Sequence, residues 1–132
     1  FLLHELIPLE LQARHPDKWR GDKIASEKDL VYEPDDRYSI EVKTSSNPVH
    51  IYGNRSYAQA STDEKKAKSG YYLAVNFGKF STDGRNPEIT LIRFGWLDAT
   101  DWIGQKAATG QQSRLSPEVD NNKLMIISDT VL

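Results

Sequence analysis

Two short apolar segments on either side of a turn constrain the fold of this chain more than any other feature. Residues 28–33 and 38–44 are rich in Val, Ile, Leu and Tyr. Between them, Pro34-Asp35-Asp36-Arg37 has the composition of a turn. This pattern predicts two antiparallel strands that are joined as a β-hairpin.

The second of these strands carries its charged and its aliphatic side chains on opposite faces. Successive strand side chains alternate, so Ile40 and Val42 share one face and Glu41 and Lys43 share the other. Pairing across the turn brings Asp29 near Glu41 if the register of the first strand permits it. Two carboxylates at that separation repel each other unless a cation neutralises them. Mg²⁺ suits this role, because it takes oxygen ligands and keeps several waters.

The alternative is that Glu41 and Lys43 only decorate the solvated face of an antiparallel strand, as such triplets commonly do. Three features favour a functional site. Asp29 lies at the start of the partner strand, about a dozen residues upstream. The second strand continues into the small polar residues Thr44-Ser45-Ser46-Asn47, and the segment after these predicts a helix that crosses over the sheet.

The rest of the first half predicts a helix, a loop and a βαβ unit. Residues 1–14 have the apolar spacing of an amphipathic helix, whose regular part we expect to begin at Pro8, and residues 15–22 have loop composition. Residues 55–68 predict a helix that ends before a glycine, and residues 71–77 predict a buried strand. A strand, a helix and a second buried strand build parallel sheet.

The second half gives weaker signals. Residues 88–94 alternate as a strand that would pair with the preceding one, and residues 96–103 predict a short helix or turn. Residues 104–122 are polar and predict a loop, and residues 123–128 predict a last strand.

Composition sets the outer limits. A chain of 132 residues with 38% hydrophobic and 27% charged residues is expected to form one folded, soluble domain. No apolar run is long enough to span a bilayer, and the lack of cysteine excludes disulfides and thiolate metal sites, which agrees with a cytoplasmic protein. The chain begins with Phe1 rather than Met, so we expect a fragment that lacks native N-terminal residues.

The order of Asp29, then Glu41-Val42-Lys43, then a helix and a further strand resembles the PD-(D/E)XK nuclease superfamily. Longer segments are similar to the ScaI-like type II restriction endonucleases, and this match covers most of residues 1–80. The segments that carry it are Glu27-Lys28-Asp29-Leu30-Val31-Tyr32, Tyr38-Ser39-Ile40-Glu41-Val42-Lys43-Thr44-Ser45-Ser46 and Tyr52-Gly53-Asn54-Arg55-Ser56-Tyr57-Ala58-Gln59.

The resemblance implies an α/β fold with a restriction-endonuclease-like core, in which helices flank a central mixed β-sheet in the order α-β-β-β-α-β. It also implies that Asp29 and Glu41 bind Mg²⁺ and that Lys43 orients or helps to deprotonate the attacking water. A further acid on the first helix often completes such a site, and Glu5 and Glu10 are the candidates.

One assignment has a rival within the hairpin. The superfamily's first acidic motif is often written Pro-Asp, and the literal Pro34-Asp35 lies in the turn, whereas Lys28 precedes Asp29. We prefer Asp29, because a turn position would carry Asp35 away from the face of the sheet.

The implied activity is Mg²⁺-dependent hydrolysis of double-stranded DNA at a specific sequence, leaving 5′-phosphate ends, by a homodimer in a prokaryotic cell. The candidate DNA contacts follow the second strand of the hairpin and begin the next helix: Ser45, Ser46, Asn47, Asn54, Arg55 and Gln59. Gln112 and Arg114 lie in a polar segment that either reaches a DNA groove or is an ordinary loop. A net charge of −2 excludes general, non-specific affinity for nucleic acid.

Two other functions fit the same residues. A structure-selective or repair nuclease of this fold would not give discrete fragments from intact duplex DNA. A non-catalytic module that binds DNA or protein would keep its function after Asp29, Glu41 and Lys43 are changed to alanine.

Overall fold

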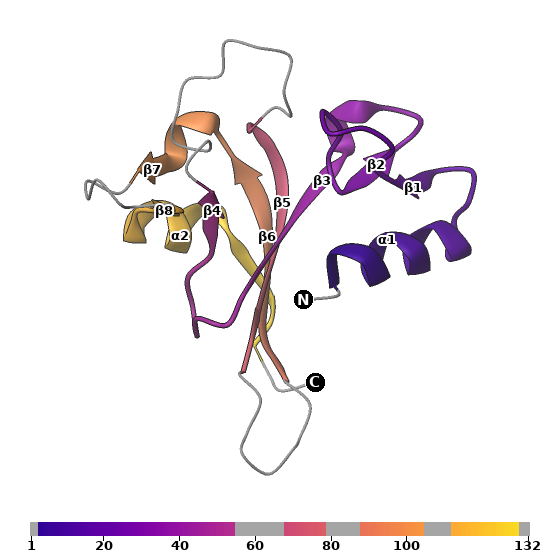
Figure 1. The fold of residues 1–132 in the computed structure, drawn as a ribbon. Helices are drawn as coiled ribbons and strands as arrows, with labels where there is room; N and C mark the ends of the chain where they lie inside the picture. Colours follow the sequence, from indigo (N-terminus) through magenta and orange to yellow (C-terminus); the bar gives the residue numbers. More distant parts are fainter. Residues whose placement is uncertain (1–2, 55–67, 79–87, 105–111, 130–132) are drawn as a thin grey trace.

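The computed structural model describes residues 3–54, 68–78, 88–104 and 112–129. The chain is an α/β protein with a mixed central sheet (Figure 1). The elements in chain order are α1 (Leu3–Arg14), β1 (Trp19–Gly21), β2 (Leu30–Tyr32), β3 (Ile40–Ser45), β4 (Tyr52–Asn54), β5 (Gly70–Phe77), β6 (Ile89–Leu97), β7 (Trp102–Gly104), β8 (Gln112–Leu115), α2 (Pro117–Lys123) and β9 (Met125–Ser128), with single 3₁₀ turns at Asp36–Tyr38 and Ala99–Asp101.

The central sheet has six strands in the order β1-β2-β3-β5-β6-β9. Its only parallel pair among the described strands is β3 with β5, and the other neighbours are antiparallel. The mixed sheet and the two helices agree with the expected α/β class. The expected order α-β-β-β-α-β is not confirmed, because four strands, β1 to β4, follow α1 before residue 55. The next expected element, the helix at 55–68, lies almost wholly outside the described residues.

The predicted hairpin is present. Strands β2 and β3 are antiparallel, with Leu30 opposite Ile40. The turn between them contains a 3₁₀ turn, which Asp35 caps by accepting a hydrogen bond from the backbone N–H of Arg37 (3.0 Å). Ser39 closes the turn, because its hydroxyl accepts from the N–H of Tyr32 (3.0 Å).

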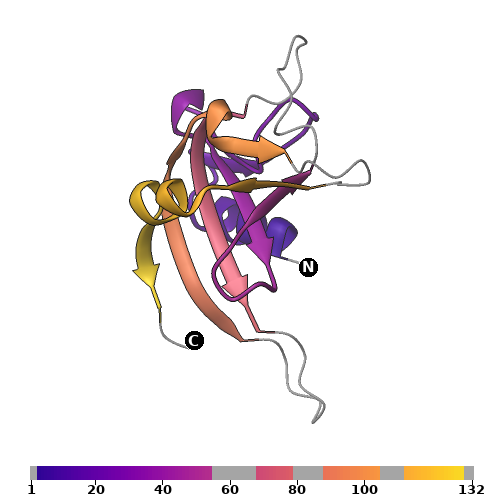
Figure 2. The same ribbon diagram turned by 90° about the vertical axis from the view of Figure 1, so that its left-hand side faces the viewer.

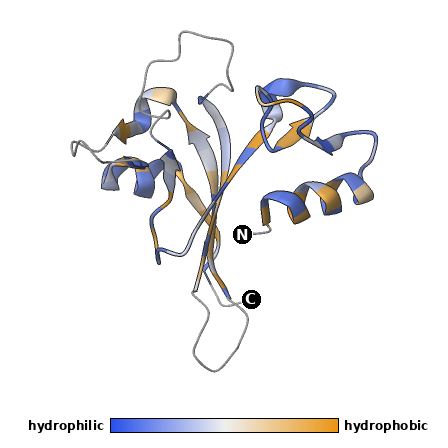
Figure 3. Ribbon diagram, viewed as in Figure 1, coloured by the Kyte–Doolittle hydropathy of each residue, from blue (hydrophilic) through white to orange (hydrophobic). Residues whose placement is uncertain are grey.

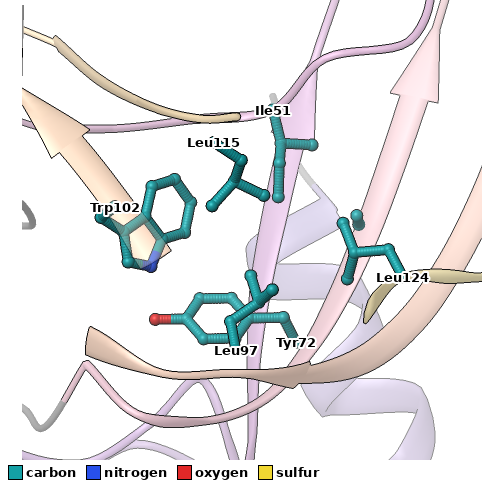
Figure 4. Packing of buried hydrophobic residues seen from close by; sticks show 7 residues of the cluster. Ile51, Tyr72, Leu97, Trp102, Leu115 and Leu124 are labelled. Carbon is teal, nitrogen blue, oxygen red and sulfur yellow. The ribbon is translucent and has the colours of Figure 1, made fainter. Parts of the chain in front are cut away.

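A second sheet packs on one face of the first. It has three strands in the order β4-β8-β7, and Figures 1 and 2 show it with α2 on one side of the central sheet, while α1 lies on the other side against β1. A hydrophobic cluster fills the space between the two sheets (Figure 4). Its members are Ile51, Tyr72, Ala74, Leu97, Trp102, Leu115 and Leu124.

The hydropathy of the elements agrees with this arrangement. Figure 3 shows α2 as mostly hydrophilic, while β2 and stretches of the central strands are hydrophobic. Both helices are short, and none in the described part of the chain has the length and apolar character needed to cross a lipid bilayer.

Several expectations for the loops were wrong. The segment 15–22 contains β1, whose three residues pair with β2 and gave no alternating pattern. The polar segment 104–122 contains β8 and α2, because alternate β8 residues, Ser113 and Leu115, are buried against the core. Helix α1 begins at Leu3, and Pro8 lies inside it rather than at its start. The short helix or turn expected in the segment 96–103 is confirmed in part, since a 3₁₀ turn lies there between the end of β6 and the start of β7.

Candidate functional site

The hairpin brings Asp29 and Glu41 to the same place. Continuing the antiparallel register from Leu30 and Ile40 sets Asp29 directly opposite Glu41. Glu41 is only 2% exposed. It lies on the face of β3 that the second sheet covers, since its partner on β5 is the core residue Tyr72.

The backbone of Val42 fixes the position of Asp29. The Val42 N–H donates to Oδ2 of Asp29 (2.9 Å). The carbonyl oxygen of the same residue accepts from Nε2 of His4 at the start of α1 (3.1 Å). A carbonyl oxygen only accepts, so this contact requires the tautomer that carries its proton on Nε2. The side chains of Asp29 and His4 thus pair with both backbone groups of Val42, at a point on β3 that lies beyond the end of β2.

The pKa of Tyr72 is affected by the same two carboxylates. Burial raises the pKa of the Tyr72 hydroxyl far above its usual range, a hydrogen bond with Trp102 opposes the shift, and the negative charges of Glu41 and Asp29 add to it. Both carboxylates therefore act on one buried hydroxyl, which donates to the carbonyl oxygen of Lys68.

Lys43 lies on the same face of β3 as Glu41, two residues along the strand. Its partner on β5 is Ala74, next to Tyr72 on the covered face. The side chain of Lys43 is half-buried. The alternation predicted from sequence therefore holds for Glu41 and Lys43, and the structure buries the carboxylate far more than an ordinary surface strand would.

Asp35 lies apart from this cluster. Its carboxylate binds the guanidinium of Arg37 (2.7 Å) and caps the turn, and this ion pair and capping bond hold the pKa of Asp35 below its usual range. A carboxylate engaged in a turn is a structural group, and its position agrees with the preference for Asp29.

The acids of α1 are exposed. Glu10 binds Arg14 one turn along the helix (2.7 Å), and Glu5 lies next to His4 in the first turn. Within residues 3–54, 68–78, 88–104 and 112–129, no group of three or more acidic, His or Cys side chains is close enough to hold a metal ion. The described structure therefore brings Asp29 and Glu41 together without adding Glu5 or Glu10 to them.

The polar residues after β3 form a tight turn. Asn47 accepts through Oδ1 from the N–H groups of Val49 and His50 (3.0 and 2.9 Å), and Ser45 accepts through its hydroxyl from the N–H of Asn47 (3.0 Å). Ser46 is half-buried beside them, and Asn54 is exposed at the end of β4. Arg55 and Gln59 lie outside the described residues.

Sequence reasoning missed His4 and Tyr72. A histidine on a short helix gives no local sign that it will bind a strand 38 residues away. Tyr72 sits within an apolar run that predicted only a buried strand. The signal for it was the parallel pairing itself, because that pairing sets Tyr72 beside Glu41.

The donor set fits a hard divalent cation. Two carboxylates that face each other on neighbouring strands provide oxygen ligands, and Mg²⁺ binds one or two carboxylates while keeping waters in its other positions. A thiolate or polyhistidine site is absent from the described cluster.

The comparison with known proteins identifies one family. The sequence matches the ScaI restriction endonuclease family over residues 1–128. It is also 57% identical over 129 residues to the Type II restriction enzyme ScaI of Streptomyces caespitosus, which covers 96% of this chain and 56% of that relative. The chain thus spans about half the length of the curated relative it matches. No solved structure gives a significant match. From its N-terminal helix through its last strand, this chain belongs to the ScaI restriction endonuclease family.

Proposed function

We propose that this chain carries the catalytic centre of a type II restriction endonuclease that hydrolyses phosphodiester bonds of duplex DNA at a specific sequence, leaving 5′-phosphate ends. Family membership and the 57% identity to a Type II restriction enzyme support the class of reaction. The observation that carries the proposal is the placement of Asp29 opposite Glu41, with Lys43 two residues along the same strand face.

Each of the three side chains has a distinct task in this proposal. Asp29 and Glu41 would hold Mg²⁺, which when bound would polarise the phosphate and lower the pKa of a water ligand. Lys43 orients the water and stabilises the negative charge that develops on the phosphate. The N–H of Val42 holds Oδ2 of Asp29, which fixes this carboxylate beside β3. Glu5 is the favoured third acid, since it adjoins His4 at the end of α1 that touches β3.

The partner of this site is double-stranded DNA. Ser45, Ser46, Asn47, Asn54, Arg55 and Gln59 are the proposed contacts, because short polar and amide side chains bind phosphates and base edges. A homodimer suits palindromic sites, since a two-fold axis of the protein then matches that of the DNA. The matched relative is bacterial, which favours action in a bacterial cytoplasm.

Cleavage of plasmid DNA tests the proposal. We expect the protein in Mg²⁺ to give discrete fragments with 5′-phosphate ends, and we expect EDTA, Lys43→Ala, Asp29→Asn and Glu41→Gln each to reduce the rate at least 100-fold. Asp35→Asn is the matched control, because Asp35 is the literal Pro-Asp acid and lies in the turn; its rate should remain within about twofold of wild type.

The alternatives predict other results. A structure-selective nuclease would leave intact duplex plasmid uncut and would cut branched DNA. A binding module would leave both uncut in every variant. Loss of activity in Asp35→Asn together with full activity in Asp29→Asn would show that Asp35, and not Asp29, is the metal ligand.

A further inference from the structure

Arg114 differs from the other arginines in the described part of the chain. Arg14, Arg20, Arg37 and Arg93 each bind a carboxylate. Within those same residues the guanidinium of Arg114 has neither an ion pair nor a hydrogen bond, and its side chain is exposed on β8. An unpaired cation on a surface strand is common, so a role for Arg114 has to be argued from the residues around it.

The neighbours of Arg114 line a cavity with it. Tyr52 on β4 is its cross-strand partner, and Tyr52, Arg114 and His50 all border a cavity of about 160 Å³. The Tyr52 hydroxyl accepts a hydrogen bond from Nδ2 of Asn47 (3.3 Å), so its own proton is available to a ligand. The cavity therefore presents a guanidinium, a phenol and an imidazole.

A buried ion pair lies beside the imidazole. Asp120 and Arg93 are each 4% exposed, and Oδ1 of Asp120 lies 3.0 Å from Nη1 of Arg93. The other oxygen, Oδ2, lies 3.7 Å from Nδ1 of His50, whose side chain is 47% exposed. The carboxylate thus lies on the Nδ1 side of the ring, beyond hydrogen-bond distance, and Nε2 is the second ring nitrogen that a ligand could contact.

The loop that carries His50 is held through its backbone. Asn76 donates from Nδ2 to the carbonyl oxygens of Asn47 (2.8 Å) and His50 (3.0 Å), and Arg93 donates from Nη2 to that of Val49 (2.6 Å). Both donors are buried. The cavity is therefore built before any ligand arrives, which lowers the entropic cost of binding.

The charges of the residues that line the cavity favour an anionic ligand. Arg93 balances the charge of Asp120, so Arg114 supplies the excess positive charge. A tetrahedral phosphate has enough acceptor oxygens for a guanidinium, a hydroxyl and an imidazole together.

Asn76 connects the cavity to the strand that carries the proposed catalytic residues. Asn76, which holds His50, is the β5 partner of Ser45, four residues beyond Glu41 on the same strand face. That separation is about 13 Å along the strand. DNA rises about 3.4 Å per base pair, so DNA that lies along β3 would pass from Glu41 to Ser45 within a few base pairs.

We infer that His50, Tyr52 and Arg114 bind a backbone phosphate of duplex DNA a few nucleotides from the bond that is cut. The inference rests on the proposed function, and it assigns these residues to positioning the DNA rather than to the chemical step.

The salt dependence of DNA binding tests the inference. Binding of a duplex oligonucleotide is measured in EDTA, where no cleavage takes place, over a range of KCl concentrations. We expect Arg114→Gln to weaken binding about tenfold at 0.1 M salt and to reduce the slope of log Kd against log salt by about one, since one phosphate contact is lost. Tyr52→Phe should weaken binding roughly fivefold with an unchanged slope, because a hydroxyl carries no charge.

The matched control is Arg14→Gln, which removes an equal charge from the exposed face of α1 and should leave both values unchanged. Wild-type affinity and slope in Arg114→Gln would overturn the inference, and so would an equal loss in Arg14→Gln. Plasmid cleavage by the wild-type protein is measured in parallel. A wild-type protein that cuts DNA, with an Arg114→Gln variant that binds normally, refutes this site alone. A wild-type protein that neither binds nor cuts duplex DNA refutes the proposed function and this site together.

Discussion

A single arginine ties together the segment that leads to Asp29. Arg20 on β1 binds Glu33 (2.5 Å) and also Glu27, which lies two residues before Asp29. Glu27 accepts in addition from the backbone N–H groups of Lys23 and Ile24 (2.8 and 3.3 Å). One carboxylate thus closes the loop between β1 and β2, and this loop sets where β2 begins.

These contacts give Glu27 an acid-dependent role in stability. Its hydrogen bond with Arg20 and that with the Lys23 N–H lower its pKa from 4.5 to about 2. A carboxylate whose pKa is lower in the folded state stabilises the fold above the unfolded pKa, and that stabilisation disappears as pH falls from about 4.5 to about 2.

We therefore expect Glu27→Gln to lower the melting temperature at pH 7 and to flatten its dependence on pH between 5 and 2. Thermal melts followed by circular dichroism at several pH values measure both effects. Glu10→Gln removes a carboxylate from an exposed pair on α1 and serves as the control. Parallel pH profiles for wild type and Glu27→Gln would contradict this role.

At this scale the sequence predicted which way side chains point but not what they meet. The period of a strand was enough to set Glu41 and Lys43 on one face. The burial of Glu41 depends on β5 and the second sheet, and the bond from His4 depends on how α1 docks. Neither is encoded in local spacing.

Among the elements, the contact of α2 with β6 requires a glycine. A Cβ at Gly95 would lie 1.9 Å from the carbonyl oxygen of Lys123 and 2.9 Å from its carbonyl carbon. The end of α2 is fixed there, because Nζ of Lys123 binds both Asp98 (3.0 Å) and Asp101 (2.6 Å). Backbone cannot move aside as the tip of a side chain does.

We expect Gly95→Ala to destabilise the fold by about 1–3 kcal/mol through overpacking. Chemical denaturation measures the change in the free energy of unfolding. Gly78→Ala is the control, since a Cβ there comes no closer than 3.9 Å to the carbonyl oxygen of Glu88. Equal stability of the two variants would show that α2 shifts freely on β6.

The elements differ in how well the sequence predicted them. The hairpin and the parallel strand were predicted, because turn composition and a buried apolar run are strong local signals. Strand β8 was missed because two of its four residues are polar and exposed, and it gains its partners only from β4 and β7. Helix α2 did carry a signal, since Ser116 caps it through the Val119 N–H (3.2 Å) and Pro117 follows directly.

On the scale of the whole molecule, one cluster joins the two sheets. Leu115 of β8 and Trp102 of β7 pack against Tyr72 of β5 and Leu97 of β6 (Figure 4). The second sheet has only short strands, so its stability depends on this contact. We expect the two sheets to unfold together.

Leu115→Ala tests this coupling. Removing a buried leucine side chain should cost about 2–5 kcal/mol. Circular dichroism and tryptophan fluorescence should give coincident transitions at a lower denaturant concentration than in wild type. The control is Leu9→Ala, whose side chain is exposed on α1. Separate transitions by the two probes in Leu115→Ala would show that the second sheet unfolds alone.

The side chains that close the edge of β3 also affect the solubility of the protein. An uncovered strand edge offers N–H and C=O groups to strands of other molecules and so promotes aggregation. Asp29 and His4 occupy both groups of Val42 where β2 no longer covers it. A variant that lacks the carboxylate at position 29 would leave the N–H of Val42 open to a strand of another molecule. The hydrogen-bond acceptor at position 29 therefore protects the solubility of the fold, independently of any part that the carboxylate plays in catalysis.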